Sequence, residues 1–317
     1  VNGDGVPDIV SGAYWYEGPD FKRRHRIADV AQVAGYHDDF CDYPMDVDGD
    51  GRPDIITGSW FGQTLRWRRN PGKAGAEWRT FDIDECANIE TIRFYDIDGC
   101  GVPEIFPNTP FAPQAFYKLI VDESGKGTGK FLKTVIGAEN SGHGLGFADV
   151  NGDGRTDIVL SEGWLEQPED PFRGPWVFHR EFSLGSASVP ILGHDVNGDG
   201  LTDLIVGQAH DYGLHWYEQR LRGDGTREWI KHEIDMSGSQ FHDLWLADLD
   251  GDGEPELITG KRYRAHNDDD PGAHDPIGIY YYKIGGGVFE KHVISFGPAG
   301  EATGAGIYFW VQDVTGN

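Results

Sequence analysis

The sequence predicts an all-β fold of the β-propeller class, in which sheets of four antiparallel strands repeat along the chain. Three observations predict this fold. A loop rich in Asp and Gly recurs at intervals of 46 to 65 residues, and the shorter of these intervals match the period of a propeller blade. The segments between the loops are short, β-branched and aromatic, as strands are. No segment keeps the 3.6-residue apolar period of a helix, which argues against a helical solenoid.

The recurring loop has the pattern D-x-[DN]-x-D-G-x-x-[DE]. Its near-complete copies span residues 46–54, 149–157, 195–203 and 248–256, a degenerate copy spans 96–104, and partial copies span 1–8 and 313–317. These seven starts predict seven blades. A six-bladed ring, in which residues 307–311 complete the first blade, is the alternative. We expect one domain over residues 1–317, truncated at both ends because the first and last copies are partial.

The strands of one blade can be followed from loop to loop. Residues 144–148 lead into a loop as an inner strand, residues 156–161 leave it as a second strand, and residues 176–180 form an outer strand. The next blade repeats this order with residues 204–207, 214–217 and 229–234. The longest interval carries extra residues at 266–275, and we expect a long loop there, of the kind that often carries function.

The spacing of the acidic residues in each loop is typical of a calcium site. Positions 1, 3, 5 and 9 supply side-chain oxygens and position 7 a carbonyl, and a hard cation takes six to eight such ligands. Magnesium is the alternative ion, and an acidic turn without an ion is the alternative structure. The predicted ligands are Asp46, Asp48, Asp50, Asp54, Asp149, Asn151, Asp153, Asp157, Asp195, Asn197, Asp199, Asp203, Asp248, Asp250, Asp252 and Glu256. In the degenerate copy Cys100 replaces the third carboxylate, so we expect weak binding or none.

Composition narrows the class of protein. The formal net charge is −26, with 53 acidic and 27 basic residues, which argues against a nucleic-acid partner. No apolar run approaches the length of a membrane helix, so no membrane partner is expected. Three cysteines do not make a disulfide framework, although a single bridge between Cys86 and Cys100 stays open. Calcium-type loops favour an extracellular or periplasmic setting.

A second group of residues is predicted at the opposite end of the inner strands. Inner strands surround the propeller axis, so the loops at their starts gather at one mouth of the channel. Six residues before the first Asp of a loop lie Glu90, His143 and His242, and His37 and Asp38 lie slightly further back in their blade. The loops that follow the second strands reach the same face and carry Trp60, Trp164, His210, Tyr212, Lys261, Arg262 and His266.

This mixture of side chains suits metal-assisted chemistry on a sugar. His143, His210, His242 and His266 are the candidate zinc ligands, because three imidazoles with an open fourth position form a catalytic zinc site. The metal would polarise a carbonyl. A histidine or a carboxylate would take a proton, while Tyr212 or a second histidine would act as acid. Lys261 or Arg262 would hold an enolate. Trp60 and Trp164 would stack on sugar rings, the alternative for both being packing within the blades, and His37, Asp38 and Glu90 would be further substrate contacts. The alternative for every histidine is a local structural hydrogen bond, which we expect for His25, His179, His232 and His292 in the outer strands.

The Asp loops resemble the FG-GAP or VCBS-type propeller repeat, which is also found in integrin α-subunit heads. Longer strings are similar to the propeller domain of the aldos-2-ulose dehydratase (1,5-anhydrofructose dehydratase) family: residues 38–40, 43–51, 142–146, 162–168, 210–219, 239–242 and 259–266. This resemblance implies seven blades, cupin-type domains beside the propeller, and zinc-dependent dehydration of keto-sugars. The family's metal ligands were not matched residue by residue, so the ligands named above rest on position and chemistry.

Two functions are therefore expected from different classes. The first is a metal-dependent carbon–oxygen lyase, a dehydratase that acts on a keto-sugar or related carbohydrate at the mouth of the channel. The second is a non-catalytic, calcium-stabilised module that binds protein or glycan. Fold alone does not separate them. A transition metal held by imidazoles, apart from the calcium-type loops, would distinguish the lyase from the binding module.

Overall fold

The computed structural model describes residues 1–140, 142–263 and 265–314. It is almost entirely β: the described residues form strands β1 to β25 and one short 3₁₀ turn, η1 (Ala265–Asp268). None of the helical structure in these residues has the length or apolar character to cross a bilayer. The chain divides into two compact units, Val1–Ala138 together with residues from Gln312 onward, and Glu139–Val311.

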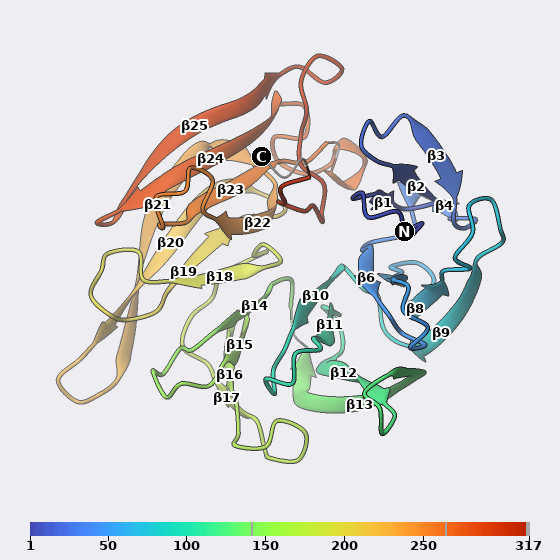
Figure 1. Ribbon diagram of the computed structural model, residues 1–317. Helices are drawn as coiled ribbons and strands as arrows, with labels where there is room; N and C mark the ends of the chain where they lie inside the picture. Colours follow the sequence, from blue (N-terminus) through green and yellow to red (C-terminus); the bar gives the residue numbers. More distant parts are fainter. Residues whose placement is uncertain (141, 264, 315–317) are drawn as a thin grey trace. The chain divides into compact units, whose positions relative to one another are not determined.

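The first unit contains antiparallel sheets that follow one another along the chain (Figure 1). A three-stranded sheet and a hairpin come first: β1 (Ile9–Ser11), β2 (Tyr14–Glu17) and β3 (Arg23–Arg26), then β4 (Gln32–Val33) and β5 (Tyr36–His37). Two four-stranded meanders follow: β6 (Tyr43–Met45), β7 (Asp54–Gly58), β8 (Thr64–Arg69) and β9 (Arg79–Glu85), and β10 (Thr91–Tyr95), β11 (Glu104–Asn108), β12 (Pro113–Val121) and β13 (Gly127–Asn140). The last residues of β13 enter the second unit.

The second unit contains an eight-stranded and a four-stranded sheet. The eight strands are two meanders joined where β14 and β18 pair in parallel. They are β14 (Leu145–Ala148), β15 (Asp157–Leu160), β16 (Gly163–Glu166), β17 (Val177–His179), β18 (Ile191–His194), β19 (Asp203–Gly207), β20 (Tyr212–Leu221) and β21 (Arg227–Ser239). The four-stranded sheet is β22 (Phe241–Ala247), β23 (Glu256–Lys261), β24 (Ile277–Gly285) and β25 (Val288–Gly297).

These four-stranded meanders are the blades that the repeat predicts, so the all-β, propeller-like class is confirmed. The second strand of each meander is fully buried, in β7, β11, β15, β19 and β23 alike. That burial on both faces explains their continuous Ile, Leu and Val content. The strands expected at residues 144–148, 156–161, 176–180, 204–207, 214–217 and 229–234 all have counterparts here. The number of blades, seven or six, stays a prediction.

The outer strands share one cross-strand arrangement. His25, His179 and His232 each lie opposite a tryptophan of the neighbouring strand and stack on its ring at 4.2 to 4.4 Å between centroids. His292 stacks in the same way on Tyr281. These four histidines therefore lie in outer strands and pack on aromatic rings, in agreement with the structural role expected for them.

Two expectations need correction or completion. The six-bladed alternative needs residues 307–311 as a closing strand, and these residues form none. Instead, the Phe309 N–H donates to the Asp243 carboxylate at 2.7 Å, and the Trp310 ring packs on Trp245 at 5.6 Å, so side chains replace a strand partner. The bridge left open between Cys86 and Cys100 is not formed, because both thiols are free.

Candidate metal centre

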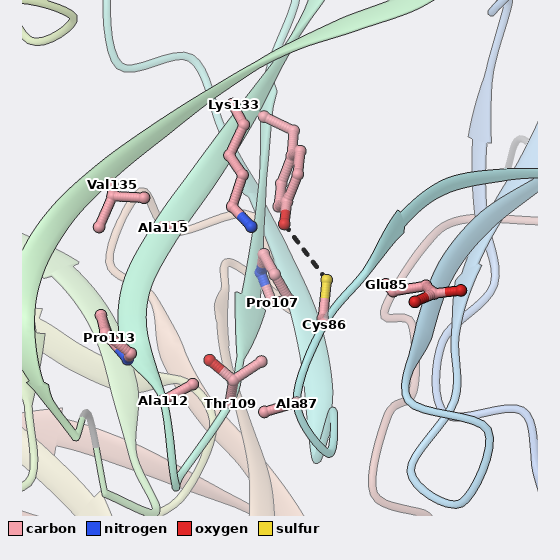
Figure 2. A pocket seen from close by; sticks show the side chains of 11 residues that line it. Glu85, Cys86, Ala87, Pro107, Thr109, Ala112, Pro113, Ala115, Lys133 and Val135 are labelled. Carbon is pink, nitrogen blue, oxygen red and sulfur yellow. Dashed lines mark hydrogen bonds between the residues drawn. The ribbon is translucent and has the colours of Figure 1, made fainter.

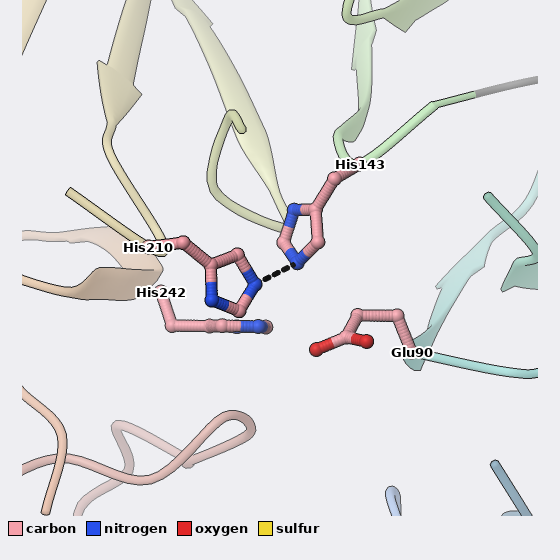
Figure 3. A group of neighbouring side chains, drawn as sticks. All are labelled: Glu90, His143, His210 and His242. Carbon is pink, nitrogen blue, oxygen red and sulfur yellow. Dashed lines mark hydrogen bonds between the residues drawn. The ribbon is translucent and has the colours of Figure 1, made fainter. Parts of the chain in front are cut away.

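Three histidines from separate elements of the second unit meet at one point (Figure 3). His143 lies just before β14, His210 lies in the loop between β19 and β20, and His242 is the second residue of β22. The ring centroid of His143 lies 4.6 Å from that of His210 and 5.0 Å from that of His242. The ligand atoms of these three rings lie within 4.8 Å of one another. The structure thus brings together three of the four predicted zinc ligands.

The protein fixes which nitrogen of His143 carries the proton. His143 Nδ1 lies 2.7 Å from the carbonyl oxygen of Ala187, and the Ala187 N–H donates in return to the His143 carbonyl at 3.0 Å. A carbonyl can only accept, so Nδ1 is the donor. In the neutral ring, the lone pair is therefore on Nε2.

The same reasoning applies to His210. Its Nδ1 lies 2.8 Å from Oδ2 of Asp270. The hydrogen bonds that this carboxylate receives from His210 and His266 hold the pKa of Asp270 below its usual value, even though burial acts in the opposite direction. An ionised carboxylate accepts only, so Nδ1 of His210 donates. Its Nε2 therefore also presents a lone pair when the ring is neutral.

These two lone pairs point at each other. His210 Nε2 and His143 Nε2 are 3.0 Å apart. Two acceptors at this distance repel unless a proton or a metal ion lies between them. Two nitrogens bound to one tetrahedral zinc lie about 3.3 Å apart, given Zn–N bonds of about 2.0–2.1 Å. The hydrogen bonds at both Nδ1 atoms are the contacts that metal-binding histidines usually make.

His242 completes the group from a buried position. Its side chain has no solvent exposure, and its carbonyl accepts the Val189 N–H at 2.9 Å. The ring lies nearly perpendicular to that of His143, at 81°. Three imidazole ligands would leave the fourth position of a tetrahedral zinc for a further ligand, as in catalytic zinc sites.

His266, the fourth predicted ligand, lies beside the group and shares its supporting carboxylate. Its ring stacks on His210 at 4.3 Å between centroids, and its Nδ1 lies 2.8 Å from the second oxygen of Asp270. Its backbone is left-handed, with φ of 46°, and Asn267 and Asp268 follow in the same region. The sequence analysis did not name Asp270 as a supporting residue. The one feature that pointed to it was the run of acidic residues within the long loop.

The remaining predicted catalytic residues lie around the second half of that loop. The buried Lys261 ammonium donates to Gln240 Oε1 at 3.1 Å and to the carbonyls of Arg262 and Ala273 at 3.3 and 3.4 Å. Burial lowers the pKa of Lys261. Tyr212 is partly exposed, and its hydroxyl donates to Asp275, which raises the pKa of the phenol. Arg262 is buried.

The predicted substrate contacts belong to both units. Trp164, in the second unit, is fully buried between His179 and the Arg227 guanidinium. The others belong to the first unit. Asp38 is buried and accepts from the N–H groups of Phe61 and Gly62 and from the Ser59 hydroxyl.

Of the other first-unit contacts, His37 is exposed on the β4–β5 hairpin. Trp60 is partly exposed, with its ring 6.1 Å from that of Phe111. Glu90 is buried just before β10, and its N–H donates to the Asn108 carbonyl. The roles predicted for all of these residues stay predictions.

The Asp loops share one internal architecture. The closing acid starts the second strand of the blade and accepts the N–H of loop position 2, as Asp54 does from Val47 at 3.1 Å and Asp157 from Val150 at 2.9 Å. The first Asp accepts the N–H of the glycine at position 6, as Asp46 does at 2.9 Å. That glycine has φ of 84° to 93° in every copy, which other residues rarely adopt. Burial raises the pKa of Asp54, Asp157 and Asp203 to about 6, so their charged forms are costly without a cation.

The loops differ in the charge that faces them. In the degenerate copy, the Lys118 ammonium donates to Asp98, lies 3.0 Å from Glu104 Oε1 and lies 3.4 Å from Cys100 Sγ. Lys283 occupies the corresponding strand position beside Glu256 and bonds to Asp250. In both loops the closing acid is Glu, and a lysine of the third strand supplies positive charge.

Comparison with known proteins supports the repeat. The model of the FG-GAP-like repeat matches residues 46–106 and 195–259. The chain therefore contains FG-GAP-like repeats. No curated protein matches the sequence.

The solved structures that match include the biofilm matrix protein Bap1 of V. cholerae, with 20% identity and a TM-score of 0.37. The match covers 77% of this chain and 37% of that protein, so the chain spans well under half of its length. The resemblance to aldos-2-ulose dehydratases stays a prediction.

Proposed function

We propose that the second unit binds a transition metal, most simply zinc, through His143, His210 and His242, and that the protein uses it as a carbon–oxygen lyase on a keto-sugar. The observation that carries the metal site is the pair of Nε2 atoms 3.0 Å apart, with both Nδ1 protons committed to acceptors. The donor set of neutral imidazoles is the one zinc prefers. When bound, the metal would polarise a substrate carbonyl and acidify the neighbouring C–H.

The surrounding side chains can supply the proton transfers of an elimination. The exposed His266 ring is held through Nδ1 by Asp270, which presents Nε2 as an acceptor for the substrate C–H proton. The Tyr212 phenol keeps its proton because Asp275 raises its pKa, so it suits the acid that protonates the departing hydroxyl. Lys261 is already bonded to three protein oxygens, so we assign it to holding the loop rather than to holding an enolate.

Product formation tests this proposal. The zinc-loaded protein is incubated with a keto-sugar such as 1,5-anhydrofructose, and the conjugated enone that dehydration produces is followed by its ultraviolet absorbance. We expect turnover that the His143→Ala, His242→Ala double variant abolishes and that a His292→Ala control retains. Equal absorbance change in wild type and double variant would reject the lyase.

We also propose that the near-complete Asp loops bind calcium. The support is the raised pKa of their closing Asp residues and the glycines that let each loop wrap around an ion. The loop that begins at Asp96 is the exception, because Cys100 stands where the other loops have their third carboxylate.

A non-catalytic binding module is the second candidate, and an exposed aromatic surface in the first unit favours it. Phe111 is 66% exposed and its ring lies 6.1 Å from that of Trp60, and Phe61, which follows Trp60 in the sequence, is 37% exposed. Exposed aromatic clusters of this kind mark interaction sites, and aromatic rings stack well on glycans. A Phe111→Ser variant that loses binding to an immobilised glycan, while a zinc-selective chelator in excess calcium leaves wild-type binding intact, would support this candidate over the lyase.

A further inference from the structure

A small pocket in the first unit has an unusual lining. It has a volume of about 200 Å³ and lies among the ends of β9, β11, β12 and β13. Its walls are mostly small and apolar, from Ala87, Pro107, Ala112, Pro113, Ala115 and Val135. Glu85 and Lys133 are the charged residues that line it, together with the Cys86 thiol, Thr109 and Tyr117.

A chain of hydrogen bonds forms its polar end. The Tyr117 hydroxyl donates to Asp84 Oδ2 at 2.7 Å, and the Lys133 ammonium donates to the same oxygen at 2.6 Å. Since the phenol proton is used there, the Cys86 thiol donates to the Tyr117 oxygen at 3.2 Å. Burial raises the pKa of this thiol, so the sulfur is a neutral, weakly polar surface and not a nucleophile.

Of the described residues that line the pocket, Lys133 is the charged one whose side chain points into it. Figure 2 shows the Lys133 ammonium turned toward the same space as the Cys86 sulfur, with the Glu85 carboxylate pointing to the other side. An ammonium has three N–H donors, and Asp84 accepts one of them. An anion in the pocket could accept another, and the aliphatic walls would then cover an apolar chain attached to it.

We propose that this pocket binds a small aliphatic carboxylic acid, with its carboxylate on Lys133 and its chain against Cys86, Pro107 and Ala112. A pocket of about 200 Å³ holds roughly six waters at about 30 Å³ each, which is the room that a five-carbon acid needs. The site lies within the first unit and uses none of the residues assigned to the metal centre, so it does not depend on the proposed function.

Binding of valerate to the full chain, followed by saturation-transfer NMR and titration of amide shifts, tests the proposal. Each methylene added from propionate to valerate should tighten binding about fourfold, the value expected for a buried CH₂. The neutral analogue pentanamide should bind at least about tenfold more weakly, because it lacks the charge-assisted bond to Lys133.

Matched variants complete the test. Lys133→Met should weaken valerate binding at least about tenfold, and Ala112→Phe, which fills the pocket, should abolish it. Lys130→Met, an exposed lysine on the same strand, should leave it unchanged. Absence of valerate binding, pentanamide binding as tight as that of valerate, or unchanged binding in Lys133→Met or Ala112→Phe would each overturn the proposal.

Discussion

Single side chains determine what the histidine group can bind. Two of the three rings are held at Nδ1, which leaves Nε2 for a ligand: the Ala187 carbonyl holds His143 and the Asp270 carboxylate holds His210. His25 and His232, in contrast, bond through Nε2 to the glutamates Glu17 and Glu218, and each stacks on a tryptophan. The histidines alone gave no sign of this difference in the sequence, because it depends on partners far along the chain.

The Asp270 carboxylate should therefore control metal affinity. Asp270→Asn removes the anionic acceptor that orients His210 and His266, and loss of such a supporting group typically weakens metal binding 10- to 100-fold, so we expect a loss of about that size. Competition with a chromogenic zinc chelator measures it. Asp269→Asn, at the exposed neighbouring position, is the control. Equal zinc affinity in Asp270→Asn and wild type would remove Asp270 from the site.

One buried histidine outside the group should make stability depend on pH. Burial lowers the pKa of His215 to about 4, whereas the unfolded chain has the ordinary value of 6.5. Between these values only the unfolded state takes up the proton, so the stabilisation is complete above pH 6.5 and is lost as the pH falls toward 4.

Urea unfolding at pH 7 and pH 4.5 checks this expectation. The wild type should lose about 2 kcal/mol more than His215→Gln between the two pH values. The variant has no titrating group at this position, so it is the reference against which the loss in the wild type is measured. Parallel losses in the two proteins would show that His215 does not contribute.

At the scale of the element, the Asp loop and the strand after it form one unit. The closing acid is both the last loop residue and the first strand residue, and its carboxylate binds back to the loop. This is why the repeat pattern predicted the blades and the second strands so well. The segment 307–311 was predicted less well, because its aromatic residues look like a strand but pack through side chains instead.

The degenerate loop should depend on its lysine. Lys118→Met leaves the buried Glu104 and the neighbouring Asp98 without the ammonium, so we expect the unfolding free energy to fall by about 2 kcal/mol in chelator. Added calcium should recover part of this loss. Lys130→Met is the matched control. If the Lys118→Met protein is as stable as wild type in chelator, the Lys118 ammonium does not stabilise this loop.

At the scale of the whole molecule, the net negative charge and the repeated acidic loops both point to bound or internal cations. A net charge of −26 is unfavourable for a compact protein unless cations or internal lysines offset the acidic loops. The sequence predicted the fold class and three clustered histidines, because in a blade the start of the inner strand and the loop after the second strand lie at the same end. It did not predict the supporting Asp270 or the internal role of Lys261. These depend on the path of loops whose conformation no periodicity encodes.

Metal content of the purified protein tests the central claim most directly. Elemental analysis is made on the wild type beside the His143→Ala, His242→Ala double variant, after equilibration with zinc and calcium and removal of free ions. The account predicts about one equivalent of zinc in the wild type, none in the double variant, and equal calcium in both. Equal zinc in the two proteins, or none in the wild type, would contradict a metal centre at these histidines.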